Sequence, residues 1–385
     1  MSYDTTPSIL SQDDPMNKKD DTATHPCQVR TDTPGDRTKN SDIRQMVMVL
    51  HGPEVFDSGN AEWLSRVLAP KKIVVAGVMA RAAAEESGLP CEFMSVPPSV
   101  AIRMLEAPSF LANEGKTPES GRIFGEIVAS RVGGEGLIQV ECARREVICW
   151  NRKPDAAVHK ISGLTGYPVV ERMAPALMPD EGYRTIRGCL PGEAVFVNGV
   201  VIGTATGREV VIRSEGEKII PLSGLQVKDH GLEKLERAGP VDVSRAWCKS
   251  GRLRSKGPLA GPRHAIVGKV IFVDHCGHHL YRMIGNGNIC GMVTVGDDTT
   301  AVCGHIGAHL GIPILGIVDG DSDNIVPERY AKGSILAVAQ GISDDELGRE
   351  VAGIVPEGEA SWEECTARII AHIGDRAVIR KPPEP

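Results

Sequence analysis

The feature that most constrains the fold of this chain is a repeated order of short apolar runs and helical stretches. Residues 46–50 form a continuous apolar run that ends in a polar turn, and residues 72–77 form a second one. Helical patterns over 61–68 and 79–87 follow these runs. A short apolar run of this kind indicates a strand buried on both faces. Strands that alternate with helices predict a parallel sheet covered by helices.

The same order returns in the last third of the chain. The predicted strands are residues 269–274, 292–298, 314–319 and 334–339, and the predicted helices are residues 280–284, 299–310 and 344–351. Acidic residues gather where these strands end. Since ligands of open parallel sheets bind beyond the carboxyl ends of the strands, this edge is a candidate site.

A different pattern separates the two regions. An Asn198-Gly199 pair stands between two apolar runs, which is a strong signal for a β-hairpin, and residues 209–213 and 218–220 suggest another hairpin. We therefore predict an α/β protein with two Rossmann-like parallel-sheet units and a small β-rich insert between them. The expected parts are a disordered leader (1–45), an N-terminal α/β unit (46–180), the β-rich insert (181–244), a basic linker (245–263), a C-terminal α/β unit (264–355), and a C-terminal helix and tail (356–385).

Composition excludes several classes of protein. The 385 residues include 43 Lys and Arg against 50 Asp and Glu, a net charge of −7, which argues against a protein that coats nucleic acid generally. Aromatic residues, at 4%, are too few for a platform that stacks single-stranded bases. The ten cysteines show no Cys-x-x-Cys spacing, so no zinc ribbon or iron–sulfur cluster is predicted.

The sequence also bears on location. The chain starts with neither a signal peptide nor a transit peptide, and no apolar run approaches the ~20 residues of a membrane span. We expect a reduced, soluble, cytoplasmic protein that does not bind a membrane. No feature of the sequence specifies an oligomeric state.

Residues 245–263 form a basic stretch without acidic residues. Glycine and proline interrupt it. Its basic residues are Arg245, Lys249, Arg252, Arg254, Lys256 and Arg263. One interpretation is a solvated linker, and the other is a loop that contacts phosphate or nucleic acid.

Carboxylates follow two neighbouring strands of the last unit. Asp297 and Asp298 come at the end of the second predicted strand, and Asp319 and Asp321 follow the third. Crowded carboxylates raise one another's pKa or require a cation, and carboxylate oxygens suit Mg²⁺ or Mn²⁺. Asn324 stands where a calcium loop of the EF-hand type needs glycine, which argues against that motif. The alternative is that these aspartates cap turns or lie in solvent.

The helix predicted after Asp298 offers an anion site. Gly296, Thr299 and Thr300 surround its start, where free backbone amides and two hydroxyls can receive an anion, although capping alone also explains these residues. His305 and His309 are four residues apart on this helix, a spacing of metal ligands, or else two ordinary histidines of a helix face.

The end of the first strand supplies a second polar group. His51 and Glu54 could serve as acid, base or ligand, and Asp57 completes this candidate catalytic set. Ser58 and Gly59 are candidate ligand contacts. The turn after the next strand could place Arg81 on an anion.

Two motifs carry a resemblance to a known family. The sequence His-Gly-Pro-Glu-Val-Phe-Asp-Ser-Gly at residues 51–59 resembles the opening signature of a family of uncharacterised archaeal proteins, found chiefly in methanogens. Residues 295–301 and 311–321 resemble its second signature. The resemblance covers about 46–355 and excludes the leader. It implies an archaeal, cytoplasmic protein and names no reaction.

A weaker resemblance concerns the fold of the last unit. The strand that ends in Asp319-Gly320-Asp321 is similar to the acidic strand of the Toprim domain of primases and topoisomerases. That family has a glutamate after its first strand, where this chain has Asp274, and this departure argues against nucleotidyl transfer or strand cleavage with Mg²⁺.

Together these features predict a divalent-metal-dependent protein that binds or acts on a small phosphorylated or nucleotide-like ligand. In this hypothesis Asp297, Asp298, Asp319 and Asp321 hold the metal, and His51 and Glu54 transfer protons if the first unit faces the last. One alternative is a non-catalytic binding or assembly protein whose partner is a methanogen-specific protein complex. A weaker alternative is nucleic-acid binding through the basic linker.

Overall fold

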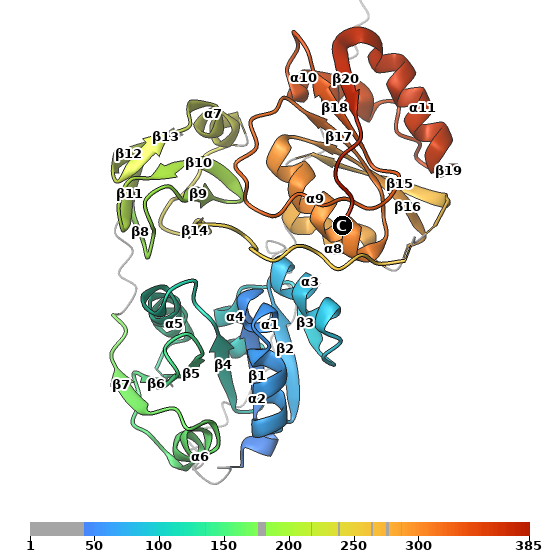
Figure 1. Cartoon of the computed structure of the whole chain (residues 1–385). Coiled ribbons are helices and arrows are strands. Elements are labelled where there is room, and N and C mark those ends of the chain that lie inside the picture. The colour runs from blue at the N-terminus through green and yellow to red at the C-terminus, as the bar shows by residue number, and fades with distance from the viewer. Residues whose placement is uncertain are drawn as a thin grey trace, which may run out of the picture. The chain divides into compact units, whose positions relative to one another are not determined.

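The structure is a computed structural model that describes residues 42–134, 136–175, 182–216, 218–237, 239–262, 265–274, 277–285 and 287–385. Residues 1–41 of the predicted leader therefore lie outside the described residues. The end of that leader belongs to the fold, because the 3-10 turn Ile43–Gln45 buries Ile43 completely. The α/β class that the sequence predicts is confirmed (Figure 1).

The first sheet has seven strands in the order β3-β2-β1-β4-β5-β6-β7. They are β1 (Val47–His51), β2 (Lys72–Ala76), β3 (Glu92–Met94), β4 (Ser109–Asn113), β5 (Leu137–Glu141), β6 (Glu146–Trp150) and β7 (Val169–Arg172). All neighbours are parallel except β5 and β6. The order reverses between β1 and β4, which makes this pair the topological switch point of the sheet.

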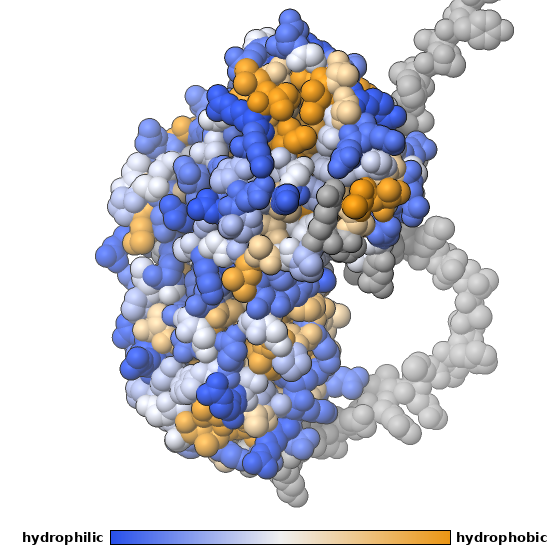
Figure 2. Space-filling view, turned by 45° about the vertical axis from the view of Figure 1, so that its right-hand side comes forward, coloured by the Kyte–Doolittle hydropathy of each residue, from blue (hydrophilic) through white to orange (hydrophobic). Residues whose placement is uncertain are grey.

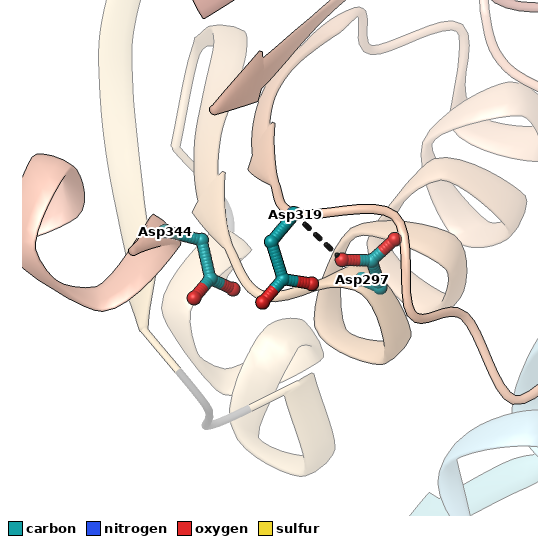
Figure 3. A group of neighbouring side chains, drawn as sticks. All are labelled: Asp297, Asp319 and Asp344. Carbon is teal, nitrogen blue, oxygen red and sulfur yellow. Dashed lines mark hydrogen bonds between the residues drawn. The ribbon is translucent and has the colours of Figure 1, made fainter. Parts of the chain in front are cut away.

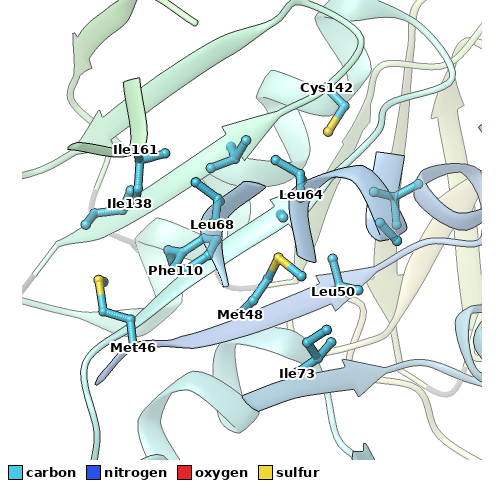
Figure 4. Close-up of a cluster of buried hydrophobic side chains, with 14 of the residues drawn as sticks. Met46, Met48, Leu50, Leu64, Leu68, Ile73, Phe110, Ile138, Cys142 and Ile161 are labelled. Carbon is cyan, nitrogen blue, oxygen red and sulfur yellow. The ribbon is translucent and has the colours of Figure 1, made fainter. Parts of the chain in front are cut away.

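Helices cover both faces of this sheet. They are α1 (Glu54–Asp57), α2 (Asn60–Leu68), α3 (Val78–Ser87), α4 (Pro98–Met104), α5 (Pro118–Val132) and α6 (Ala156–Thr165). On β1, Met48 and Leu50 face the cluster that α1, α2, α3 and α6 fill, whereas Val47 and Val49 face α4 and α5. Figure 4 shows the first cluster, in which Leu64 and Leu68 of α2 lie over Met48. This alternation explains why the strand is apolar at each position from Val47 to Leu50.

The middle of the chain forms two small antiparallel sheets, β13-β10-β9-β14 and β12-β11-β8. Their strands are β8 (Tyr183–Arg187), β9 (Ala194–Val197), β10 (Val200–Ala205), β11 (Glu209–Glu215), β12 (Lys218–Ser223), β13 (Leu225–Val227) and β14 (Cys248–Ser250), and α7 (Asp229–Arg237) packs on β10. The hairpin at Asn198-Gly199 is confirmed, since both residues have positive φ angles, 49° and 89°. The structure places β14, from the predicted basic linker, beside β9.

The last sheet has the order β19-β15-β16-β17-β18-β20, with β15 to β18 parallel and both edge strands antiparallel. Its strands are β15 (Val267–Asp274), β16 (Ile289–Val295), β17 (Ile314–Val318), β18 (Ile335–Ala339), β19 (Glu359–Ser361) and β20 (Ala377–Arg380). Its helices are α8 (Leu280–Ile284), α9 (Asp297–Leu310), α10 (Asp344–Ala352) and α11 (Trp362–Ile373), and 3-10 turns lie at Gly277–His279 and Gly374–Arg376. Helices α8 and α9 cover one face, and α10 and α11 cover the other.

The surface is mostly hydrophilic on the side that Figure 2 presents, with hydrophobic patches near the top and bottom of that view. Val378 and Ile379 of the edge strand β20 are among the exposed large apolar residues. Within the described ranges, every helix is too short or too polar to span a lipid bilayer.

Candidate functional site

Three aspartates meet at the carboxyl ends of neighbouring strands in the last sheet. Asp297 opens α9 after β16, Asp319 follows β17 directly, and Asp344 opens α10 after β18. One carboxylate oxygen of each lies within 4.8 Å of the other two (Figure 3). Gly296, with φ of 92°, makes the sharp turn from β16 into α9 that places Asp297 there. We call Asp297, Asp319 and Asp344 the acidic triad.

Backbone hydrogen bonds fix the first member of the triad. Asp297 Oδ2 accepts the N–H groups of Asp319 at 3.0 Å and of Gly320 at 3.1 Å. Asp344 Oδ1 accepts the N–H of Asp345 at 2.8 Å. These bonds leave further carboxylate lone pairs of the triad available to a ligand.

Electrostatics in the triad favour a positive partner. Burial raises the pKa of Asp319, and the charges of Asp321 and Asp297 raise it further. Burial also raises the pKa of Asp344, which is only 1% exposed, and Lys234 only partly opposes this. Carboxylates that resist ionisation because they share a small space are stabilised by a bound cation.

The two other aspartates of the predicted metal set lie outside the acidic triad. Asp298 Oδ1 accepts the N–H of Asp323 at 3.2 Å, and burial together with the Asp323 charge raises the pKa of Asp298 to about 7. Asp321 forms an ion pair with Lys228 at 2.9 Å, and Lys228 also reaches Asp323 at 2.8 Å. Burial raises the pKa of Asp321, but the hydrogen bond and charge of Lys228, the charge of Lys234 and a hydrogen bond with Asp319 together outweigh burial, so the pKa is lowered.

Asp344 is the member of the triad that the sequence reasoning missed. It was predicted as the start of a helix, and Ser343 does cap that helix by accepting the N–H of Glu346 at 3.1 Å. The available signal was positional, since Asp344 follows the strand next to the one before Asp319. The carboxyl ends of adjacent parallel strands lie at one edge of a sheet.

The predicted anion contacts lie at the start of α9. Thr299 is half-buried in the first turn, where backbone N–H groups have no partner inside the helix. Thr300 is buried, and its hydroxyl forms a hydrogen bond of 2.7 Å with that of Thr294. The Gly296 N–H donates to the carbonyl of Ile317 at 3.0 Å. Thr299 is therefore the hydroxyl of this set that is best placed for a ligand.

The predicted catalytic residues of the first unit lie at the end of β1. His51 Nδ1 donates to the carbonyl of Ala76 at 2.7 Å, and its ring stacks on Phe124 with 4.7 Å between centroids. Burial lowers the pKa of His51 to about 4, so the imidazole is neutral near pH 7. Glu54 opens α1, and burial raises its pKa, with Lys249 opposing that rise.

Asp57, in contrast, is held in a buried ion pair. Arg254 donates to its two carboxylate oxygens at 2.9 and 2.6 Å and to those of Glu86 at 2.9 and 2.7 Å. Arg254 comes from the predicted basic linker and is only 1% exposed. Its Nη1 also lies 3.3 Å from His305 Nε2. The arginine therefore joins the first unit to α9, and the solvated-linker interpretation does not describe this residue.

The remaining predicted contacts are engaged within the protein. The Ser58 hydroxyl donates to the carboxylate of Glu114, and Gly59 precedes α2 with φ of 80°. Arg81 donates to Glu85 at 2.8 Å and lies over the ring of Tyr281, 4.0 Å from its centroid. His309 lies 3.5 Å from the same Glu85.

The candidate residues thus form two groups. Asp57 connects through Arg254 to His305, which stands eight residues after Asp297 on α9. With a rise of ~1.5 Å per residue, Asp297 and His305 are about 12 Å apart along the helix axis. The structure brings Asp297 and Asp319 together and places His51 and Glu54 in a separate group at the end of β1.

An open cavity of about 460 Å³ lies beside that second group. It is lined by Asn60, Trp63, Glu114, Cys142, Ala143, Arg145, Thr165 and Tyr167. Glu114 follows β4 directly and Cys142 follows β5. The cavity therefore opens at the carboxyl edge of the seven-stranded sheet.

The chain matches, over residues 48–359, a family described as "uncharacterized protein conserved in archaea" (DUF2117). It belongs to this family. The resemblance that the two sequence motifs carry is thereby confirmed. Asp297, Asp319, Asp344, His51 and Glu54 all lie within the part that DUF2117 covers.

One curated relative is uncharacterized protein MJ0065 of Methanocaldococcus jannaschii. It is 32% identical over 326 residues, which cover 78% of this chain and 89% of that protein. A comparison with solved structures returns a chain described as "GsuK channel bound to NAD" with a TM-score of 0.18 and 13% identity. That alignment covers 86% of this chain and 66% of the channel chain.

Proposed function

We propose that this DUF2117 protein binds a divalent metal ion at the acidic triad and there binds or acts on a phosphorylated or nucleotide-like ligand. The observation that carries the proposal is the meeting of Asp297, Asp319 and Asp344 within 4.8 Å at the ends of three adjacent strands. Strand ends in a packed sheet are rigid, so the three carboxylates keep their spacing without a ligand.

The donor set fits Mg²⁺ or Mn²⁺. Both ions prefer carboxylate oxygens, and Mg²⁺ usually keeps several waters and shares its remaining positions with substrate phosphate. The half-buried Asp297 and the exposed Asp319 leave one side of the triad open to such a ligand. The similarity of Asp319-Gly320-Asp321 to the acidic strand of Toprim domains supports a metal at the same edge.

The start of α9 suits a phosphorylated ligand. Asp297 is the first residue of this helix, so a metal on its carboxylate would lie beside the free N–H groups of the first turn and the Thr299 hydroxyl. The N-terminus of a helix of 14 residues favours anions through its dipole. Phosphate oxygens could thus contact the metal and the helix together.

The decisive experiment measures bound metal directly. The protein, purified without a histidine tag, is dialysed against Mn²⁺ and then against buffer, and metal is counted by elemental analysis. We expect about one Mn²⁺ per chain, lost in a D319N/D344N double variant because two of three anionic ligands disappear. Mg²⁺ should compete with Mn²⁺.

E346Q is the matched control, because Glu346 is an exposed carboxylate two residues after Asp344 on α10 and does not belong to the triad. We expect it to retain the metal. Equal metal content in native protein and D319N/D344N would overturn the triad as the site. No binding of Mn²⁺ or Mg²⁺ to the native protein would instead favour the non-catalytic assembly protein, and its partner would be sought by pull-down.

A further inference from the structure

The switch point of the seven-stranded sheet holds polar groups that the acidic triad does not use. His51 of β1 and Asn113 of β4 are register partners at the carboxyl ends of these strands. Beyond them the chain turns into α1 on one side and into Glu114 and Lys116 on the other. A sheet whose strand order reverses opens a crevice at this place, where ligands of α/β proteins bind.

Strand β14 is held against this crevice. Lys116 Nζ donates to Ser250 Oγ at 3.0 Å and to the Ser250 carbonyl at 3.3 Å, and it pairs with Glu193. Gly251 has φ of 81°, and a Cβ there would lie 2.7 Å from Glu193 and 3.1 Å from Lys116 Nζ. The close fit at Gly251 and the bonds at Ser250 determine where Lys249 lies.

Lys249 is a cation without a fixed partner at this position. The Glu54 carboxylate lies over Gly52, where a Cβ would be 2.8 Å from Glu54 Oε2, so this carboxylate stands next to His51. The charge of Lys249 acts on both of these residues. Within the described part of the chain, no carboxylate forms an ion pair with its ammonium. Burial lowers the pKa of Lys249, and the attraction of Glu54 compensates only in part. A partly desolvated ammonium of this kind is stabilised by an anion.

The neighbouring His51 side chain offers a hydrogen-bond acceptor. A carbonyl only accepts, so His51 Nδ1 must carry the proton of the hydrogen bond to Ala76. The Nε2 atom of the neutral ring is then an acceptor and needs a donor. Burial raises the pKa of Glu54, and the charge of Lys249 acts in the opposite direction.

We propose that this crevice is a second ligand site, which takes a small hydroxylated oxyanion such as a hydroxy acid or a phosphate monoester. The anionic oxygen binds Lys249, and a hydroxyl of the ligand donates to His51 Nε2. The ligand thus needs both features, because Lys249 only donates and the free nitrogen of His51 only accepts.

The cavity of about 460 Å³ provides room for the rest of the ligand. Glu114, which lines the cavity, directly follows Asn113, the register partner of His51, so the cavity opens beside the ends of β1 and β4. The Asn60 side-chain amide donates to Glu114 at 2.9 Å and fixes this carboxylate. Trp63, which also lines the cavity, makes binding visible through its fluorescence.

Inorganic phosphate and sulfate are the probes, because hydrogen phosphate carries an anionic oxygen and a hydroxyl whereas sulfate lacks the hydroxyl. Both are titrated with EDTA present, into native protein and into K249M. We expect phosphate to bind native protein about 10-fold more tightly than sulfate, and K249M to lose about 10- to 100-fold in phosphate affinity. D319N/D344N should bind phosphate like the native protein, which separates this site from the acidic triad.

A measurement on the native protein removes any dependence on the folding of K249M. Trace acetic anhydride labels lysines, and mass spectrometry compares Lys249 with the exposed Lys256 of the same segment. Phosphate should protect Lys249 several-fold and leave Lys256 unchanged. Labelling of Lys249 that phosphate does not affect would overturn the proposal, as would unchanged phosphate affinity in K249M.

Discussion

Arg254 shows how a single residue joins distant parts of this sequence. Its guanidinium is 1% exposed and is bound by both oxygens of Asp57 and of Glu86, and the Glu86 side chain is 3% exposed. Bidentate contacts with two carboxylates use the planar geometry that distinguishes arginine from lysine. The pairing also explains why Asp57, though close to His51 in sequence, is not available for proton transfer.

Substitution of Arg254 by alanine should be strongly destabilising. It leaves two carboxylates without their cation, and Glu86 is buried too deeply for water to replace it. Breaking such a buried pair costs about 3–5 kcal/mol in the free energy of unfolding. Urea unfolding measures the difference. R254K should lie between the alanine variant and the native protein, because lysine keeps the charge but loses the bidentate geometry.

R252A is the control for this prediction, since Arg252 is exposed two residues earlier in the same segment. A surface change of this kind should alter the free energy of unfolding by less than about 0.5 kcal/mol. If R254A and R252A unfold at the same urea concentration, the buried pair does not stabilise the fold.

The sequence allowed some site residues to be predicted and not others, for a physical reason. Asp297 and Asp319 directly follow apolar strands, so their position at a sheet edge could be inferred from the chain itself. Asp344 comes five residues after β18, and capping of α10 was the more obvious role. The charge of Lys249 acts on Glu54, about 195 residues away in the sequence, and nothing local to a basic segment interrupted by glycine and proline signals that interaction.

At the scale of elements, the prediction was most reliable for the strands that form a continuous apolar run. The runs at 72–77 and 314–319 became β2 and β17 with ends shifted by one residue. Strand β4 was missed, because its apolar run is limited to Phe110, Leu111 and Ala112 between polar ends and the surrounding region has weak periodicity. That omission matters, since the switch point exists only because β4 pairs with β1 on the side away from β2.

Helix α7 depends on a glycine for its contact with β10. A Cβ on Gly231 would lie 1.9 Å from the carbonyl oxygen of Val201, which is a backbone atom that cannot move away easily. We expect G231A to destabilise the protein by about 1–3 kcal/mol or more, through displacement of the helix. Thermal unfolding followed by circular dichroism tests this.

Gly163 of α6 is the matched helical control, because a Cβ there meets nothing within 4 Å. Alanine at an open helical position removes the entropic cost of glycine, so G163A should raise stability by up to about 1 kcal/mol. Opposite signs for the two variants are the expected outcome. Equal effects would mean that helix propensity alone, and not the approach of α7 to β10, determines the result.

At the scale of the whole molecule, each large sheet presents polar groups at its carboxyl edge, but with different chemistry. The six-stranded sheet gathers three carboxylates, which favour a cation. The seven-stranded sheet gathers a lysine, a neutral histidine and a glutamate, which favour a hydroxylated anion. Two sites of complementary charge in one chain raise the question of whether one ligand serves both, for example a phosphate that bridges metal and lysine.

The question is answered by testing whether the contributions of the two ligands to the free energy of unfolding add. Ligands that bind separate sites without a shared partner contribute independently to the free energy of unfolding, within about 0.5 kcal/mol. Each should contribute about 2.7 kcal/mol at a concentration 100 times its dissociation constant. Because no residue belongs to both the acidic triad and the switch-point site, we expect the stabilisation by Mn²⁺ and by phosphate to sum. Thermal unfolding with each ligand and with both measures this, and K249M should abolish only the phosphate contribution.

If phosphate stabilises the protein only when Mn²⁺ is present, phosphate binds to the metal. The proposed switch-point site would then be wrong, whereas the metal site at the acidic triad would remain.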